Sequence, residues 1–213
     1  MSREEEILDN LERVRSEIPV GVTLIVVTKT YPISDIEILY KAGVRDFGEN
    51  RDHEGAQKEP AIPSDAKWHF QGQIQSNKLK SIVNWADFIH SLDDLDHAKK
   101  INKLIDSPKD VFIQLSLDGE NGRGGIDPSN LSKFLDELER LPMVNPIGLM
   151  AVAPLNEDPD LAFARLAEIK SKISLEYPAI KFLSAGMSSD YKAGLRHGAT
   201  HIRIGSSILG SRS

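Results

Sequence analysis

The sequence predicts an α/β protein that folds as a single (β/α)8 barrel of the TIM type. The first observation is that eight short apolar runs alternate with helical patterns along the chain. The second is that these runs are apolar on both faces: residues 22–27 are apolar at five of six positions and residues 111–117 at five of seven. Strands that are covered on both faces belong to parallel sheets joined by helices.

The number of expected strands and the first turn decide between two parallel-sheet folds. An open doubly wound sheet usually carries a glycine-rich turn after its first strand. Here Thr30-Tyr31-Pro32 follows instead, which favours a barrel, although 213 residues lie below the ~250 that are typical of it. The expected strands are Val22–Lys29, Arg45–Gly48, Trp68–Gly72, Ala86–Ser91, Val111–Leu117, Asn145–Val152, Lys181–Ala185 and His201–Gly205.

Helix signals fill the segments between these strands. Ser34-Asp35-Ile36-Glu37 has the spacing of a capping box. Asp127-Pro128 and Asp158-Pro159 each place a cap residue before a proline at the first helical position. An opening helix from about Glu4 to Ile18 is expected to cap the barrel's closed end or to serve a subunit contact. We expect one domain over residues 1–213, with residues 1–20 forming a helix outside the barrel.

Composition limits the classes of function. The chain has 26 Lys and Arg against 32 Asp and Glu, a formal charge of −6, which argues against nonspecific binding to nucleic acid or to an anionic membrane. Cysteine is absent, so no disulfide or thiolate chemistry is expected. The N-terminus lacks the apolar stretch of a secretory signal, and no apolar run approaches the ~20 residues that cross a bilayer. These features predict a cytoplasmic protein.

In a barrel of this type, functional side chains follow the carboxyl ends of the strands. Lys29 ends the first strand, on the same side as Ile25 and Val27. Because both faces of this strand are apolar, sharing a side with Ile25 and Val27 does not show whether Lys29 faces a pocket. A lysine partly removed from water has a lowered pKa and can condense with a carbonyl group. The alternative is a solvated lysine at a strand end.

Two small-residue segments predict a phosphate site. Gly186-Met187-Ser188-Ser189 and Gly205-Ser206-Ser207 each lead from one of the last two strands into an expected helix. The N–H groups at a helix N-terminus bind phosphate, and barrels often place a phosphate after strands seven and eight. Arg203 adds a positive charge between the two segments. Taken singly, either segment is better explained as a turn and cap.

Other polar residues have weaker signals. His69 and Gln71 share a strand face near Asn50 and could hydrogen-bond a ring hydroxyl or orient the lysine. The six histidines show no metal-ligand spacing, so no metal is expected. The glycine-rich segment 118–125 lacks the Gly-Lys-Ser/Thr ending of a phosphate loop and is expected to form a mobile lip over the pocket. A pocket lysine with a distal phosphate site fits a phosphorylated aldehyde, either pyridoxal 5′-phosphate (PLP) as cofactor or a sugar phosphate as substrate.

Six motifs stand at or near the expected strand ends, in one order along nearly the whole chain: Val27-Thr28-Lys29-Thr30, Phe47-Gly48-Glu49-Asn50, Trp68-His69-Phe70-Gln71-Gly72-Gln73-Ile74-Gln75-Ser76-Asn77-Lys78, Gly148-Leu149-Met150, Ser184-Ala185-Gly186-Met187-Ser188-Ser189-Asp190 and Ile202-Arg203-Ile204-Gly205. Together they resemble the pyridoxal phosphate homeostasis protein family. The motif at residues 68–78 is highly specific for it.

The resemblance implies a TIM-like barrel of the alanine racemase type (PLP fold type III), without that enzyme's C-terminal β-domain. It further implies that PLP is held as a Schiff base, by Lys29 at the position of the family's lysine. Whether Arg203 contacts the phosphate or the ring nitrogen stays open. The implied PLP-binding residues are Lys29, Asn50, His69, Met150, Ser184, Met187, Ser188, Ser189, Arg203, Gly205 and Ser206.

Three positions depart from the family's pattern. Arg51 stands where an aromatic residue is common, Arg123 where many relatives have lysine, and Ala185 where methionine is frequent. The second departure puts in doubt any relay of PLP through another amine at that position. None of the three changes Lys29.

The family binds and buffers PLP without an established turnover reaction, so the resemblance implies a non-enzymatic, monomeric PLP carrier that supplies PLP-dependent apoenzymes. One alternative is a PLP-dependent amino-acid racemase, which needs a second acid/base, usually a tyrosine supplied through an added β-domain. No such domain follows Ser213, and none of the four tyrosines is an obvious substitute (Tyr31, Tyr40, Tyr177 and Tyr191). Another is a class I aldolase, in which the lysine condenses with a sugar phosphate.

Overall fold

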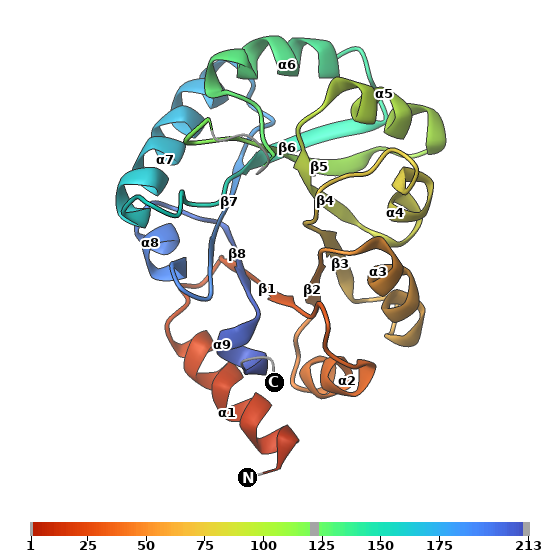
Figure 1. Cartoon of the computed structure of the whole chain (residues 1–213), viewed down its shortest axis with the longest axis vertical. Coiled ribbons are helices and arrows are strands. Elements are labelled where there is room, and N and C mark those ends of the chain that lie inside the picture. Colours follow the sequence, from red (N-terminus) through yellow and green to blue (C-terminus); the bar gives the residue numbers. More distant parts are fainter. Residues whose placement is uncertain (1, 120–123, 211–213) are drawn as a thin grey trace.

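The computed structural model describes residues 2–119 and 124–210, and within them eight parallel strands form a closed barrel in the order β1 to β8 (Figure 1). The expected barrel is therefore confirmed. All eight expected strands are present, with ends that differ by at most three residues from those expected. The strands are β1 Thr23–Val27, β2 Asp46–Glu49, β3 Lys67–Phe70, β4 Phe88–Leu92, β5 Lys109–Gln114, β6 Val144–Met150, β7 Phe182–Met187 and β8 His201–Ile204.

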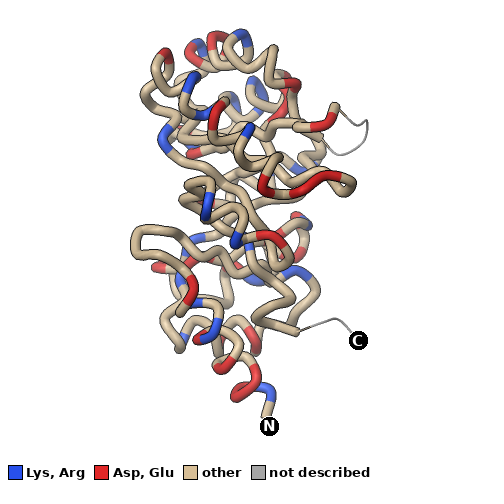
Figure 2. The backbone as a smooth tube through the Cα atoms, turned by 90° about the vertical axis from the view of Figure 1, so that its left-hand side faces the viewer, with Lys and Arg blue, Asp and Glu red and all other residues tan. Residues whose placement is uncertain are grey.

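Helices surround the barrel as a ring and bury its outer face (Figure 1). None of the described helices is long and apolar enough to span a bilayer. Lys and Arg positions interleave with Asp and Glu along the backbone (Figure 2). The helices are α1 Arg3–Ser16, α2 Ile33–Lys41, α3 Asp52–Lys58, α4 Leu79–Trp85, α5 Leu95–Leu104, α6 Leu131–Leu138, α7 Pro159–Glu176, α8 Tyr191–Arg196 and α9 Ser206–Leu209, with 3₁₀ turns at Glu59–Ala61 and Pro128–Asn130.

Two of the three expected helix caps are present. The Asp158 side chain caps α7 by accepting the N–H of Asp160, and the Asp127 side chain accepts that of Ser129, although a 3₁₀ turn precedes α6 there. The expected capping box at Ser34 is wrong: α2 begins at Ile33, and Ser34 lies in its first turn. Pro32 is the cap residue, because its extended backbone suits a helix boundary, and its side chain makes no capping bond.

The interior of the barrel is filled by imidazole and phenyl rings. His69 stacks on Phe88 with centroids 4.6 Å apart, and His90 stacks on Phe112 at 4.1 Å. His201 meets the edge of Phe112. Burial lowers the pKa of His201 to about 4, so the imidazole is neutral at pH 7. These stacked rings pack the barrel interior between its strands.

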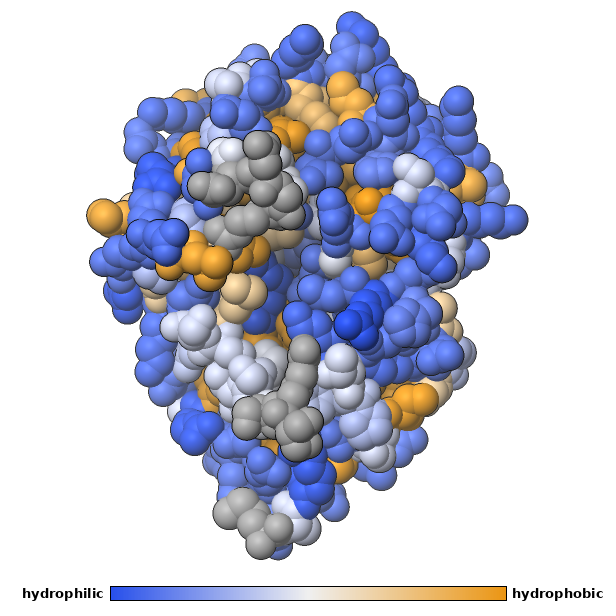
Figure 3. Space-filling view, in the orientation of Figure 1, coloured by the Kyte–Doolittle hydropathy of each residue, from blue (hydrophilic) through white to orange (hydrophobic). Residues whose placement is uncertain are grey.

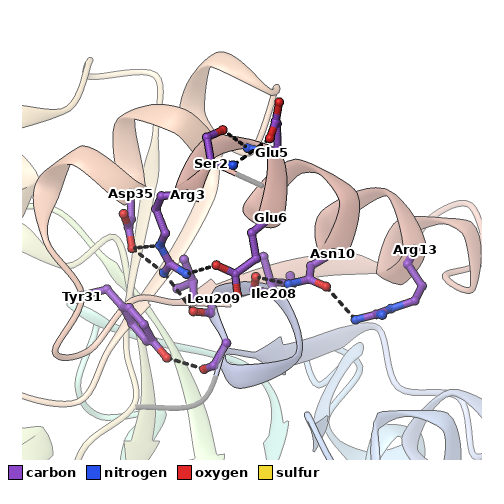
Figure 4. A network of polar contacts seen from close by, with 11 residues as sticks. Ser2, Arg3, Glu5, Glu6, Asn10, Arg13, Tyr31, Asp35, Ile208 and Leu209 are labelled. Carbon is purple, nitrogen blue, oxygen red and sulfur yellow. Dashed lines mark hydrogen bonds and ion pairs between the residues drawn. The ribbon is translucent and has the colours of Figure 1, made fainter. Parts of the chain in front are cut away.

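The opening helix α1 lies beside α9 and α2 at the edge of the ring, and not across the closed end of the barrel (Figure 1). Arg3 joins all three helices (Figure 4). Its guanidinium donates to the buried carboxylate of Asp35 at 2.7 Å and to the carbonyl of Leu209 at 2.8 Å. The chain's first helix thus holds α9, which begins at the mouth of the barrel, in place.

Replacing Arg3 by alanine should destabilise the fold. The buried Asp35 carboxylate and the Leu209 carbonyl would lose their partner, which costs about 1–3 kcal/mol of the free energy of unfolding. Urea denaturation measures this change. The control is Arg140→Ala, because Arg140 is 74% exposed in its pair with Glu137 and should contribute less than about 0.5 kcal/mol. Equal effects of the two substitutions would contradict the role assigned to Arg3.

Candidate functional site

A cavity of about 550 Å³ opens at the carboxyl ends of the strands. This volume is within the range of pockets that hold a small molecule. Figure 3 shows this face, which is mostly polar and is hollowed near its centre. The lining residues are Val27, Lys29, Tyr31, Asn50, Gln71, Met150, Val152, Met187, Ser188, Ser189, Arg203, Gly205, Ser206 and Gly210.

Lys29 follows β1 and is half-buried in the wall of this cavity. Val27, two residues earlier, lines the same cavity, whereas Val26 belongs to the apolar core outside the barrel. The structure thus shows that the side of β1 that carries Val27 and Lys29 faces the pocket. Thr30, directly after the lysine, has a φ of 70°, in the left-handed region that threonine rarely adopts.

Arg203 supplies a buried positive charge in the cavity wall. The residue is only 4% exposed, and its Nη1 donates to the carbonyl and hydroxyl oxygens of Ser184 at 2.8 and 2.7 Å. Nη2 donates to the carbonyl of Ala151 at 3.1 Å. These acceptors are all neutral, and burial lowers the pKa of the guanidinium to about 10. It remains charged at pH 7 and attracts an anionic or electron-rich ligand.

The two small-residue segments meet, as expected, at one side of the cavity. The N–H groups of Gly205 and Ser207 converge on the hydroxyl oxygen of Ser188, at 3.2 and 3.4 Å. Gly186 has a φ of 93°, and a Cβ there would lie 2.7 Å from the Cα of Tyr191. The segment that carries Ser188 can therefore turn tightly against the start of α8.

Asn50 and Gln71 reach the cavity from the ends of β2 and β3. The Asn50 Oδ1 and the Gln71 Nε2 are both buried, and neither has a hydrogen-bond partner among the residues that the structure describes. A Cβ on Gly48 would lie 2.8 Å from this Nε2, so the Gln71 amide lies directly against the backbone of β2. Buried polar groups normally have partners. An acceptor and a donor are thus available to a ligand in the cavity.

The structure places His69 and Ser184 outside the cavity lining, beneath Arg203 in the barrel interior. Ser184 Oγ is 2.9 Å from His90 Nδ1, His90 Nε2 is 2.9 Å from His69 Nδ1, and His69 Nε2 is 3.1 Å from Asp46 Oδ1. A continuous line of hydrogen bonds therefore joins Arg203 to Asp46, which is part-exposed at the start of β2.

One direction of this line fits both of its ends. A guanidinium can only donate, so Ser184 accepts from Arg203 and donates to His90. A carboxylate can only accept, so His69 donates to Asp46 and accepts from His90. His90 is then neutral. For His90 this agrees with burial, which lowers its pKa well below the ordinary value, assisted by His69, Arg203 and His201.

Several lining residues carry no clear signal in the sequence. Tyr31 lines the cavity, and its hydroxyl donates to the Gly210 carbonyl at 2.6 Å. Its position two residues after Lys29 is the only pointer to it. Val152 and Gly210 complete the lining. They come from segments whose path depends on the whole fold.

Two further expectations concern regions beside the cavity. The lip expected at 118–125 falls partly on residues 120–123, which lie outside the described residues, as does the departure at Arg123. Within the described ranges, no group of three or more His, Cys, Asp or Glu side chains could hold a metal ion.

The sequence matches the family model described as alanine racemase, N-terminal domain, over residues 3–213. A relative from Corynebacterium glutamicum, named pyridoxal phosphate homeostasis protein, is 38% identical over 202 residues, which cover 90% of this chain and 91% of the relative. A relative of the same name from Aquifex aeolicus is 36% identical over 193 residues, covering 87% and 85%.

Solved structures show the same similarity. PipY of Synechococcus elongatus PCC7942, solved without PLP, superposes with a TM-score of 0.90 at 34% identity and covers 96% of this chain and 100% of PipY. The form with PLP bound gives 0.89 at 33% identity, with the same coverage. Alanine racemase from Corynebacterium glutamicum is 15% identical with a TM-score of 0.75, and only 60% of that enzyme is covered, so it shows the fold alone.

The family model spans almost the whole chain, and the similar relatives are matched over most of their own length. The chain therefore belongs to the pyridoxal phosphate homeostasis protein family, on the barrel fold of the alanine racemase N-terminal domain.

Proposed function

We propose that the protein binds PLP in this cavity, as a Schiff base with Lys29, and takes part in intracellular PLP homeostasis without substantial turnover. The observation that carries this proposal is the presence of a half-buried lysine and a fully buried arginine in the wall of one cavity. A structural neighbour, PipY, has been solved with PLP bound.

The residues of the cavity fit this group. The unpartnered Asn50 Oδ1 and Gln71 Nε2 suit a ligand with polar ring substituents. The small polar residues Ser188, Ser189 and Ser206, which line one side of the cavity, suit a phosphate. Met150 and Met187 supply apolar surface for a flat ring. Of the eleven residues expected to bind PLP, we keep the nine that line the cavity and assign Ser184 and His69 to the support of Arg203.

Each residue has a separate task in the proposed site. Lys29 supplies the amine: its condensation with an aldehyde forms one C=N bond and releases one water molecule, and hydrolysis consumes one and restores both partners. Bound PLP would supply that aldehyde. Arg203, held by Ser184 and Ala151, keeps a fixed positive charge in the cavity. Reversible condensation together with a separate phosphate site gives affinity without committing the protein to a reaction.

The alternative, an amino-acid racemase, requires a second acid/base beside the lysine. Tyr31 is the tyrosine in the cavity lining, but its hydroxyl already donates to the Gly210 carbonyl. We therefore favour a carrier, expected to be a cytoplasmic monomer that supplies PLP-dependent apoenzymes. An aldolase has less support, since the relatives are named for PLP.

The purified protein incubated with PLP should show the visible absorbance of an imine, and Lys29→Ala should abolish it. Borohydride reduction and peptide mapping should place the label on Lys29. The matched control is Lys172→Ala, because Lys172 is 75% exposed on α7, far from the cavity lining. A wild-type protein that stays colourless and unlabelled after incubation with PLP would refute the proposed function.

Ser184→Ala should weaken PLP binding by about tenfold to 150-fold, the equivalent of ~1.5–3 kcal/mol for one lost hydrogen bond to a charged group. The substitution removes the hydroxyl that accepts from Arg203 and donates to His90. Fluorescence titration with PLP measures the affinity. Ser174→Ala serves as the control, because the Ser174 hydroxyl bonds only to backbone of α7 and the segment before β7. An unchanged affinity in Ser184→Ala would show that the line of hydrogen bonds has no bearing on the site.

A further inference from the structure

A buried ionic cluster lies next to the Lys29 segment and has no part in the proposed function. Lys58, at the end of α3, is 6% exposed. Its Nζ donates to Glu49 Oε1 at 2.8 Å and to Glu54 Oε2 at 3.0 Å. Glu49, at the end of β2, is fully buried. We refer to Lys58, Glu49 and Glu54 as the Lys58 cluster.

The cluster bonds to the chain on both sides of Lys29. On one side, the Thr28 carbonyl accepts from Lys58 Nζ at 2.8 Å, and the Thr28 hydroxyl donates to Glu49 Oε1 at 2.6 Å. On the other side, the Thr30 N–H donates to Glu54 Oε2 at 2.5 Å. The residue before the lysine is thus bonded to Lys58 and Glu49 and the residue after it to Glu54, within one connected cluster.

The hydrogen bond to Glu54 holds the Thr30 backbone in a strained conformation. Thr30 has a φ of 70°, and a β-branched residue in the left-handed region is strained by about 1–3 kcal/mol. Released from Glu54, the peptide after Lys29 would relax toward a commoner conformation. The direction in which the Lys29 side chain leaves the backbone would then change.

The cluster is also costly to bury, which argues against a role in stability alone. Two charges taken out of water seldom recover their full desolvation cost. Burial raises the pKa of the Glu49 carboxyl, and the hydrogen bonds from Lys58 and Thr28 only partly offset this. A well-packed apolar group at Lys58 would serve stability equally well, but it could not donate to the Thr28 carbonyl.

Lys58 is not itself a second amine for the ligand. An ammonium has three N–H donors, and the three acceptors of Lys58 are Thr28 O, Glu49 Oε1 and Glu54 Oε2. The helix that carries it is fixed as well: a Cβ on Gly55 would lie 2.4 Å from the Trp85 ring, so α3 packs directly on α4. Asp52 also accepts from Trp85 Nε1 at 3.1 Å.

We propose that Lys58, with Glu49 and Glu54, is a positioning group for Lys29: it holds the peptides on both sides of the lysine so that the amine enters the cavity. This proposal rests on the proposed function, since it gives the Lys29 amine a task. The phosphate end of the cavity comes from β7, β8 and α9, and no hydrogen bond described for the cluster reaches it. Loss of the Lys58 cluster should therefore weaken the Schiff base between Lys29 and PLP and leave binding of the ring and phosphate unchanged.

Two ligands separate these effects. PLP carries the aldehyde, whereas pyridoxamine 5′-phosphate has the same ring and phosphate but cannot condense with an amine. The principal variant is Glu49→Gln/Lys58→Met, which removes one charge of each sign and so keeps the net charge, while Glu54 loses Lys58 and retains its pair with Arg51 at 3.5 Å. The control is Glu168→Gln/Lys172→Met, because that pair also joins one glutamate to one lysine but is exposed on α7.

In the principal variant, the affinity for PLP should fall by about fivefold to a hundredfold, the range set by the strain at Thr30. The affinity for pyridoxamine 5′-phosphate should stay within about twofold, and the fraction of bound PLP that borohydride traps on Lys29 should fall. Glu54→Gln, which keeps an acceptor for the Thr30 N–H, should give a smaller change in the same direction. The control should match the wild type with both ligands.

Three results would overturn the proposal, and they differ in what else they refute. An undiminished borohydride-trapped fraction in the principal variant and in Glu54→Gln refutes the positioning role alone. An equal loss of affinity for both ligands, in a variant whose circular dichroism and melting temperature match the wild type, shows a general change of the cavity and also refutes it. A wild-type protein with no trappable link at Lys29 refutes the proposed function, and the positioning role with it.

Discussion

The structure depends on the closure of the sheet by the pairing of β1 with β8, in which Ile25 lies opposite Arg203. A parallel barrel directs every strand's carboxyl end to one rim. Closure therefore brings the segment after β1, with Lys29, next to the segments after β7 and β8, although these lie at opposite ends of the chain. Without this pairing, the lysine and the arginine would not share a cavity.

The rigidity of the site comes from polar groups buried in the barrel wall. Two sets of contacts converge on the cavity: the line from Asp46 through His69, His90 and Ser184 holds Arg203, and the Lys58 cluster holds the chain around Lys29. Buried polar groups are costly unless all their partners are present. Such groups restrict the conformation of the side chains they hold more sharply than apolar packing does, because their geometry is directional.

Most of the cavity could be predicted from strand ends and motifs. Nine of the eleven expected ligand-binding residues line it, and Lys29, Arg203 and Gly205 stand where the barrel rule places them. His69 and Ser184 do not line it, because a motif marks a residue as important without showing how deep it lies along the strand. The capping box at Ser34 failed for a related reason: the signal is local, but Pro32 and the strained turn at Thr30 set the start of α2.

The sequence by itself determined the eight strands, the parallel barrel and the identity of the lysine and the arginine, because hydrophobic periodicity and strand-end motifs are local properties of the chain. Only the tertiary structure decided which face of β1 meets the cavity and that Tyr31 and Gln71 line it. It alone also joined Glu49 and Lys58 to the peptides around Lys29. These contacts link different strands and helices, and their geometry is set when the barrel closes, which no local pattern encodes.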